Sequence, residues 1–401
     1  MGLNKKYNNY KSFQYLEAGK DYIPFKLAKE IARVEPYVIP LSKTEEDRVK
    51  DILEKNVVIS LHDHTDVKPE DLSELDRYTR QNRISTGYEG LSVSGLDAVF
   101  DGLLDGTNTI TSTVPWKWDS VVYEIGMRLS DFAHQDFVFV AHKVEDIYKA
   151  HREGKLAIIL HLEGAAHIEN EVDRVDILYG FGVRCMGLVY SESNAIGSGL
   201  REKNDSGITE FGYKVIERMN KIGMTIDLAH VGDKSSLDAI EASKTPVFIT
   251  HSGARALWNT NRMKPDTVLQ ALAEKGGVIG IEAAPHTTLT EKHREHTIES
   301  VMEHFQYVEK LIGIDHVTFG PDTLFGDHVG LYHVPSVMSN LSIAQTEEGP
   351  PFEEVPYVKG IENPSEFKNI IRWLVKNGYS DQEISKVIGK NVLRVLEATW
   401  K

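Results

Sequence analysis

Five residues with metal-binding side chains stand at separate points along the chain: His64, Asp66, Glu163, His230 and His251. Imidazole and carboxylate are the ligands that borderline divalent ions such as Zn²⁺ prefer. His64 and Asp66 are two residues apart, so in an extended strand both point to the same side and can reach one ion. Glu163 has two oxygens and can bridge that ion to a second one held by His230 and His251. A pair of ions lowers the pKa of a bridging water and supplies hydroxide near neutral pH, so the pattern predicts a metal-dependent hydrolase.

A third carboxylate, Asp322, strengthens this interpretation. If Asp66, Glu163 and Asp322 lie together, three negative charges are crowded at one place, and cations are needed to offset them. A single histidine near a strand end is more often a hydrogen-bonded structural residue than a ligand. The metal prediction therefore rests on the whole set and not on any one member.

An alternative set of ligands uses His62. His62-Asp63-His64 also matches the plain His-x-His signature of other barrel hydrolases, in which His62 would be a ligand and Asp66 would support the ligands from behind. Other histidines are weaker candidates. His161 is predicted to belong to the core, and His286, His293, His296 and His304 are predicted to lie on the surface.

The elements that must position these residues are short, nearly unbroken apolar runs, as expected of parallel strands buried on both faces. Amphipathic stretches separate them, so the order is strand then helix, repeated, which implies right-handed crossovers and a parallel sheet. Eight such units predict a (β/α)8 barrel, which places reactive groups at the carboxyl ends of its strands. The predicted strands are 57–61, 107–113, 156–162, 183–190, 224–230, 246–252, 277–284 and 316–322, and the predicted helices between them include 43–55, 143–153, 209–222, 233–243, 266–275 and 298–312.

We expect residues 1–401 to form a single barrel domain with additions. Residues 1–40 form an N-terminal extension, and residues 323–362 form a long insertion after the last strand, either over the site or at a subunit contact. Two helices are predicted within 365–400. Ser42 with Glu45, and Ser380 with Glu383, have the spacing of a capping box at a helix start.

Composition narrows the class of protein. The net charge is −15 with no Lys/Arg-rich stripe, which argues against nucleic acid as a partner. The single cysteine, Cys185, allows no internal disulfide, the start of the chain lacks the apolar stretch of a signal peptide, and no run is long enough to span a bilayer. We therefore expect a cytoplasmic protein without a membrane partner. Symmetric dimers are the commonest assembly, so a homodimer is the default expectation.

Seven motifs, taken in order, resemble those of the membrane dipeptidase (renal dipeptidase) family of the amidohydrolase superfamily. The resemblance runs from about residue 56 to residue 398, and the spacing of the motifs makes it specific. LHDHTDV is similar to the family's Asp-Gly-His-Asn-Asp-Leu, HLEGAAHI to Val-Glu-Gly-Gly-His, and GMTIDLAHVGDKS to Gly-Met-x-x-Asp-Leu-Ser-His-x-Ser. TPVFITHSGARAL is similar to Pro-Val-x-x-Ser-His-Ser-x-Ala, and NRMKPD to Arg-Asn-x-Pro-Asp. FGPD is similar to Phe-Gly-Gly-Asp, and IGKNVLRV to Gly-Gly-Asn-x-Leu-Arg-Val.

The resemblance implies a dipeptidase with two zinc ions and a small dipeptide as substrate. His64 and Asp66 would bind one ion, His230 and His251 the other, and Glu163 both. Asp322 would take a proton from the bridging water and deliver it to the leaving amine. Arg262 would pair with the C-terminal carboxylate of the dipeptide, for which its planar fork of donors is suited.

The chain departs from the family at the end of the fourth predicted strand. Tyr190 stands where the family has a histidine that helps to hold the substrate carbonyl oxygen. A phenol can donate a hydrogen bond to a developing oxyanion but carries no positive charge. This departure keeps two alternatives open: another binuclear barrel hydrolase, such as a deacylase or lactonase, and a barrel that binds metal without turnover.

Overall fold

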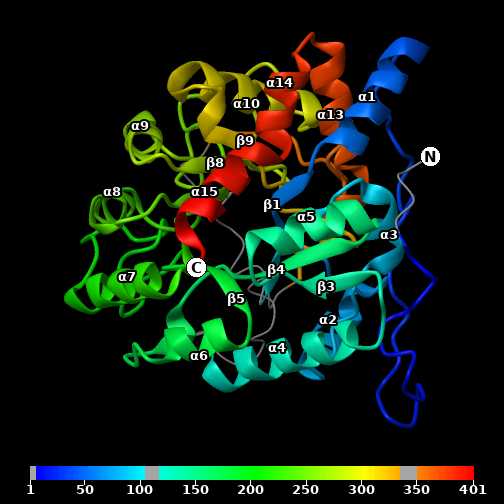
Figure 1. The fold of residues 1–401 in the computed structure, drawn as a ribbon, viewed down its shortest axis with the longest axis horizontal. Coiled ribbons are helices and arrows are strands. Elements are labelled where there is room, and N and C mark those ends of the chain that lie inside the picture. The colour runs from blue at the N-terminus through cyan, green and yellow to red at the C-terminus, as the bar shows by residue number, and fades with distance from the viewer. Residues whose placement is uncertain (1–5, 104–116, 335–349) are drawn as a thin grey trace.

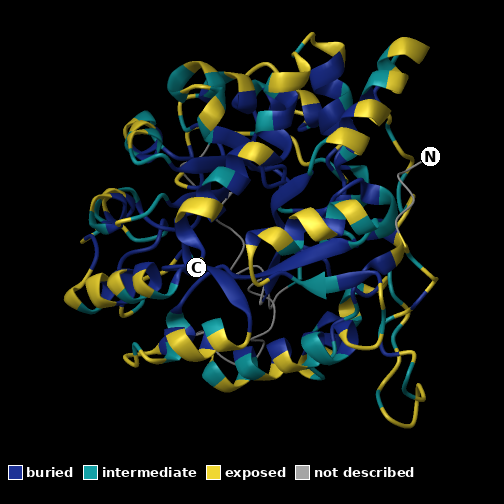
Figure 2. Ribbon diagram, in the orientation of Figure 1, coloured by how far each residue is buried: buried dark blue, intermediate teal, exposed yellow. Residues whose placement is uncertain are grey.

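The computed structural model describes residues 6–103, 117–334 and 350–401. Its strands are all parallel and belong to one sheet, and nearly every strand residue is buried (Figure 2). Burial on both faces explains why the strands are apolar runs without alternation. The strands are β1 (Ile59–Asp63), β2 (Ala98–Leu103), β3 (Val138–Val140), β4 (Leu156–Leu162), β5 (Val183–Gly187), β6 (Thr225–Asp227), β7 (Phe248–Ser252), β8 (Val278–Ile281) and β9 (Val317–Phe319).

Eight of these strands form a nearly closed barrel in the order β1-β2-β4-β5-β6-β7-β8-β9, and β3 pairs with β4 outside this path. The chain after β9 returns to β1: the amide of Asp322 donates to the His62 carbonyl at 3.0 Å, and the amide of His64 donates to the Thr323 carbonyl at 2.9 Å. These bonds join the last strand to the first. The predicted (β/α)8 barrel is confirmed.

Helices surround the barrel, and their outward faces are exposed to solvent (Figures 1 and 2). Their inner faces are apolar; in α10, for example, the Phe305 ring packs against Phe319 of β9 with ring centroids 5.1 Å apart. The helices are α1 (Lys43–Lys55), α2 (Leu75–Arg80), α3 (Tyr88–Ser94), α4 (Trp118–Phe132), α5 (Val144–Glu153), α6 (Arg174–Gly180), α7 (Glu210–Ile222), α8 (Asp233–Ala242), α9 (Asp266–Glu274), α10 (Ile298–Ile312), α11 (His328–Leu331), α13 (Lys368–Lys376), α14 (Asp381–Ser385) and α15 (Asn391–Thr399), with a π-helical turn at Lys386–Lys390.

Both predicted capping boxes are present at the starts of α1 and α14. The segment before α1 is tied to the barrel, since the Tyr10 hydroxyl donates to Asp131 of α4 at 2.7 Å. None of the helices in the described parts of the chain combines the length and the apolar character needed to cross a bilayer.

The second strand differs from the prediction. The predicted run 107–113 lies outside the described residues, and the strand that follows β1 is β2, residues 98–103. Asp101 interrupts its apolar run, which hides it from a hydropathy pattern. That carboxylate is fully buried and accepts a 2.6 Å bond from the Arg128 guanidinium of α4, so its charge is offset inside the fold.

The prediction that the later histidines are surface residues is wrong for His286, His296 and His304, which are fully buried. Local hydrogen bonds replace their water contacts. His304 illustrates this: its Nε2 donates to the Leu289 carbonyl at 2.8 Å, and its Nδ1 accepts the Ala254 amide at 2.9 Å. His304 is thus satisfied at both ring nitrogens inside the core, whereas His286 Nδ1 has no hydrogen-bond partner among the described residues.

Asp63 connects the first strand to the segment after the last one. One carboxylate oxygen accepts the amide of Thr323 at 2.9 Å and its hydroxyl at 2.7 Å, and the other accepts the Ser60 hydroxyl at 2.6 Å. The side chain is fully buried, and burial raises its pKa to about 7. Its three hydrogen bonds therefore stabilise the seam where the barrel closes.

We expect Asp63→Ala to lower the free energy of unfolding by about 2–4 kcal/mol, because buried donors of Thr323 and Ser60 lose their acceptor. Asp63→Asn is the matched control: its oxygen still accepts from Thr323 and its amide can donate to Ser60, so we expect a loss of less than about 1.5 kcal/mol. Urea unfolding of both variants measures the difference. Equal stability of the alanine variant and the unaltered protein would contradict this role.

Candidate metal centre

Polar residues gather at the carboxyl ends of the barrel strands. His62 lies in β1 and His251 in β7, while the other members lie one to three residues after a strand: His64 after β1, Glu163 after β4, His230 after β6, Glu282 after β8 and Asp322 after β9. All but Asp322 are at most 5% exposed. A barrel brings the carboxyl ends of its strands to one rim, so residues far apart in sequence meet there.

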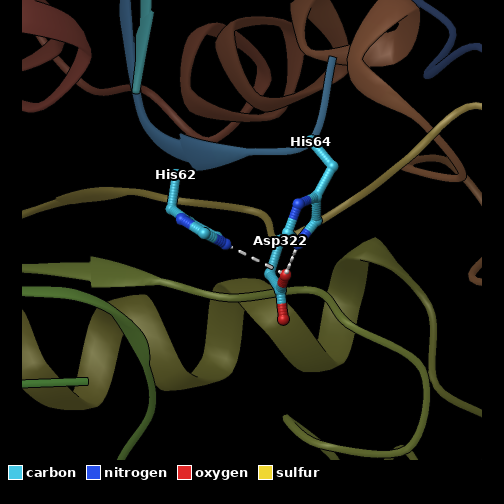
Figure 3. Close-up of side chains that lie close together, drawn as sticks. All are labelled: His62, His64 and Asp322. Atoms are coloured by element: carbon cyan, nitrogen blue, oxygen red, sulfur yellow. Dashed lines mark hydrogen bonds and ion pairs between the residues drawn. The ribbon is translucent and has the colours of Figure 1, made fainter. Parts of the chain in front are cut away.

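Asp322 lies between the β1 histidines, which are His62 within the strand and His64 just after it (Figure 3). Its Oδ1 is 3.2 Å from His62 Nε2 and 3.1 Å from His64 Nε2. The Asp322 backbone is in the left-handed region, with φ of 57°, which aspartate tolerates better than most residues. That conformation is held by the hydrogen bond of its amide to the His62 carbonyl, so the closure of the barrel also sets the position of the carboxylate.

Glu163 faces four imidazoles with its two oxygens. Oε1 lies 3.7 Å from His64 Nε2, whereas Oε2 lies 3.3 Å from His230 Nε2, 3.6 Å from His251 Nε2 and 3.9 Å from His62 Nε2. The carboxylate therefore stands between two groups of nitrogen donors. This is the arrangement that a bridging ligand needs.

The outer ring nitrogens of three histidines are held by oxygens of the barrel. Nδ1 of His64 lies 2.9 Å from the Gly102 carbonyl, that of His230 lies 3.0 Å from the Ser191 hydroxyl, and that of His251 lies 2.8 Å from the Thr250 hydroxyl. Such bonds fix the orientation of a ligating imidazole and raise its basicity. In each ring they leave Nε2 directed inward.

His62 is oriented by a chain of buried groups. Its Nδ1 lies 3.2 Å from His161 Nδ1, and His161 Nε2 lies 3.2 Å from Asp227 Oδ2. Asp227 in turn accepts the amides of Ala229 and Thr250. His161, predicted as a core residue, is buried and supports His62 from behind.

The geometry fits a bound cation. A carbonyl can only accept, so His64 Nδ1 donates to Gly102, and a neutral His64 then directs an unprotonated Nε2 at the Asp322 carboxylate 3.1 Å away. Two lone pairs facing each other at this distance are favourable only with a positive charge beside them. The His230 and His251 Nε2 atoms also point at each other, 3.0 Å apart.

Burial keeps these imidazoles in the form that binds metal. It lowers the pKa of His62 to about 4, and it lowers the pKa values of His230 and His251 well below the ordinary histidine value. Burial also opposes ionisation of Asp322, but protonation of the facing rings of His251, His62 and His64 would hold its pKa well below the usual range, and a bound cation would act in the same direction. Neutral imidazoles beside ionised carboxylates are the donor set of a divalent-metal site.

Donor atoms converge in three overlapping groups among the described residues. The groups are His62, His64 and Asp322; His62, Glu163 and His251; and His251, Glu282 and Asp322, and in each the donor atoms lie within 4.8 Å of one another. Two ions could share such a cluster.

The family model of the membrane dipeptidases, peptidase family M19, matches residues 46–343 and 349–401. The chain belongs to the membrane dipeptidase family. This confirms the resemblance seen in the sequence motifs, and membership in this metallopeptidase family implies a divalent metal.

Relatives support the same assignment. The chain is 30% identical over 266 residues to the dipeptidase tcpJ of Claviceps purpurea, covering 66% of this chain and 56% of that protein. It is 28% identical over 267 residues to the dipeptidase verJ of Clonostachys rogersoniana, covering 66% of this chain and 61% of that one. The matches thus span less than two thirds of the length of these curated relatives.

A solved structure shows the same fold as this membrane dipeptidase family chain. It is an amidohydrolase from Pseudomonas aeruginosa, which superposes with a TM-score of 0.71 at 24% identity and covers 88% of this chain and 99% of its own.

Of the predicted ligands, His64, Glu163 and His251 belong to the three convergent groups. His230 and Asp66 do not, but His230 Nε2 lies 3.3 Å from Glu163 and 3.0 Å from His251 Nε2. Asp66 Oδ2 pairs with Lys68 Nζ at 2.9 Å, and both side chains are buried. His62 is present in two of those groups. The geometry thus favours the alternative ligand set, in which the His-x-His pair of β1 points inward and Asp66 supports from outside.

The two predicted substrate residues border the cluster. The Tyr190 ring stacks on the His230 ring with centroids 4.1 Å apart, and therefore lies beside the predicted second metal position. Arg262 is 3% exposed; its Nη1 donates to the Ala229 carbonyl at 3.2 Å, and its Nη2 pairs with Glu282.

Glu282 was missed by the sequence analysis. It sits in GVIGIEAA, a predicted strand, as the single charged residue of an apolar run. A carboxylate at the end of a barrel strand is the signal that identified Glu163, and the same rule applied to this strand would have found Glu282.

Gly102 leaves the space that the two β1 imidazoles occupy. A Cβ at this position would lie 2.7 Å from His62 Cε1 and 2.8 Å from His64 Cε1. We expect Gly102→Ala to displace both rings and weaken metal binding by about 10–100-fold, the range for disturbed ligand support. Competition with a chromogenic chelator measures the affinity.

Gly126→Ala is the control, because a Cβ there meets no atom within 4 Å. Gly126 lies inside α4, where alanine stabilises by roughly 0.5–1 kcal/mol, so its metal affinity should stay unchanged. Unaltered affinity in Gly102→Ala would show that these histidines do not bind the metal.

Proposed function

We propose that the chain is a metal-dependent dipeptidase that holds two divalent ions, most suitably Zn²⁺, and hydrolyses the amide bond of dipeptides. The observation that carries the proposal is the convergence of four buried imidazole nitrogens on Glu163 and Asp322. Bound ions would polarise the peptide carbonyl and lower the pKa of a water held between them, which supplies a nucleophile near neutral pH.

In this proposal Glu163 would be shared by the two ion positions, with His64 nearest to its Oε1 and with His230, His251 and His62 nearest to its Oε2. Its oxygens already face both groups at 3.3–3.9 Å. Ligands that are held rigidly by hydrogen bonds on their outer nitrogens do not need to reorganise when the substrate enters.

Asp322 would move the proton. It lies beside both β1 imidazoles and is the carboxylate at the end of the last strand. An ionised carboxylate can take a proton from the attacking water and pass it to the leaving amine, which must be protonated to depart. Tyr190, beside His230, would donate a hydrogen bond to the developing oxyanion.

Names and ligands of relatives agree with this substrate class. The two fungal relatives are named dipeptidases. A metallopeptidase from Rhodobacter sphaeroides, of the same fold with a TM-score of 0.67 at 19% identity over 86% of this chain and all of that one, was solved with a phosphinate mimic of the dipeptide L-Ala-D-Ala. A D-residue on the C-terminal side should therefore be included among the substrates tested.

A second candidate function is another binuclear amidohydrolase activity, such as a deacylase or lactonase. The Arg262–Glu282 pair favours it, since the residue expected to bind a substrate carboxylate already has an acidic partner. Tyr190 in place of the family histidine points in the same direction.

Metal removal tests the proposed function. We expect the purified protein to contain about two equivalents of metal, and its hydrolysis of L,L and L,D dipeptides to stop on chelation and return with Zn²⁺, because the nucleophile depends on the ions. Elemental analysis beside a dipeptide panel gives both readouts. Two metals without cleavage would direct the search to other amides and esters, and a protein that takes up no metal would refute the proposal.

Asp322→Asn tests the proton transfer. We expect kcat to fall by about 10²–10⁴-fold, the usual contribution of a positioned acid or base, with metal content unchanged. Asp315→Asn is the control, since Asp315 is an exposed partner of Lys386 and should retain full activity. Full activity in Asp322→Asn would exclude the role, and loss of metal would make Asp322 a ligand instead.

A further inference from the structure

Arg262 is not available as an isolated positive charge. It lies on the loop after β7, is buried, and uses one guanidinium nitrogen for the Ala229 carbonyl and another for an ion pair with Glu282. Two of its guanidinium nitrogens therefore already have partners within the protein. A guanidinium has five N–H donors, so some of them stay available. A substrate carboxylate at this place would have to share the remaining donors with Glu282.

Glu282 holds this position rigidly. It follows β8, its amide donates to the Ser252 carbonyl at 3.0 Å, and its side chain is fully buried. The carboxylate lies at the inner edge of the metal cluster, with an oxygen within 4.8 Å of donor atoms of His251 and Asp322. It therefore faces both the predicted ions and the residue predicted to bind substrate.

The charged groups around Arg262 disfavour the binding of a substrate carboxylate. The positive charge of Arg262 is offset by Glu282, and Asp322 adds a negative charge nearby. Like charges brought together in a buried site repel strongly, because the low dielectric screens them little. At Arg262, a free substrate carboxylate would have to compete with Glu282 for the same guanidinium, whereas an uncharged group would not.

We propose that Glu282 is a specificity-determining residue that occupies Arg262 and directs the site toward substrates whose C-terminal carboxyl group is blocked as an amide or ester. This inference rests on the proposed dipeptidase function and specifies its substrate class. The substitution of a neutral residue for Glu282 releases Arg262 and opens the site to free carboxylates.

The test compares one dipeptide with its own C-terminal amide on the metal-loaded enzyme. We expect the unaltered enzyme to favour the amide form in kcat/KM by about tenfold or more, and Glu282→Gln to lower KM for the free dipeptide by a similar factor with little change for the amide. Glu282→Met, of similar size and without charge, should act in the same direction if the glutamine variant does not fold.

Glu362→Gln is the matched control. Glu362 is a glutamate 6% exposed and paired with Arg33 at 2.5 Å, but it belongs to none of the convergent donor groups. It tests whether loss of any buried Glu–Arg pair changes the preference, and we expect an unaltered ratio of KM values.

A binding measurement separates this inference from the proposed function. Calorimetric titration with a free amino acid and with its amide needs no turnover, because these compounds mimic the leaving product. We expect Glu282→Gln to gain about tenfold in affinity for the free amino acid and to be unchanged for the amide. If no dipeptide is cleaved but this gain is seen, the inference stands and the proposed function fails. If dipeptides are cleaved and the preference is the same in both proteins, the inference fails alone. Loss of metal from Glu282→Gln would also overturn it, by making Glu282 a ligand.

Discussion

The site depends on unprotonated imidazole nitrogens held opposite carboxylates inside a barrel that excludes water. His64 is the clearest case, because its outer nitrogen must donate to a backbone carbonyl and its inner nitrogen therefore meets Asp322 without a proton of its own. In water such a pair would turn away or gain a proton. Here the bond to the Gly102 carbonyl holds the His64 ring in place, and a divalent cation beside the pair is one way to satisfy both groups.

The barrel provides this arrangement through strand ends and not through any local motif. The ends of six strands, β1, β4, β6, β7, β8 and β9, contribute one or two side chains each, and the rings are oriented by neighbouring groups such as Thr250 for His251 or Gly102 for His64. The metal donors are thus preorganised by the same hydrogen bonds that hold the rim together. Rigid support of this kind suits chemistry in which charge develops at a fixed point.

The sequence predicted the barrel, the positions of most helices and the region of the site, because strand burial and helix periodicity are local signals. It could not predict β2, since Asp101 becomes acceptable in a buried strand only through Arg128, a partner distant in sequence. The choice between His62 and Asp66 was open for a related reason: alternation places His62, His64 and Asp66 on one side, and only the path of the chain after β1 turns Asp66 toward Lys68. Which of two equally suited residues faces the interior is decided by tertiary packing.

Closure of the barrel has a consequence for how the protein matures. The bonds of Asp63 to Thr323, and of His62 and His64 to Asp322, join positions about 260 residues apart. Contacts of such long sequence separation form late, after the loop entropy has been overcome. During synthesis, His62, His64, Glu163, His230 and His251 all leave the ribosome before Asp322 does. The nascent chain can therefore hold the nitrogen donors and Glu163 before the carboxylate proposed to transfer the proton is present, and a complete site should form only in the final folding step that seats the last strand against the first.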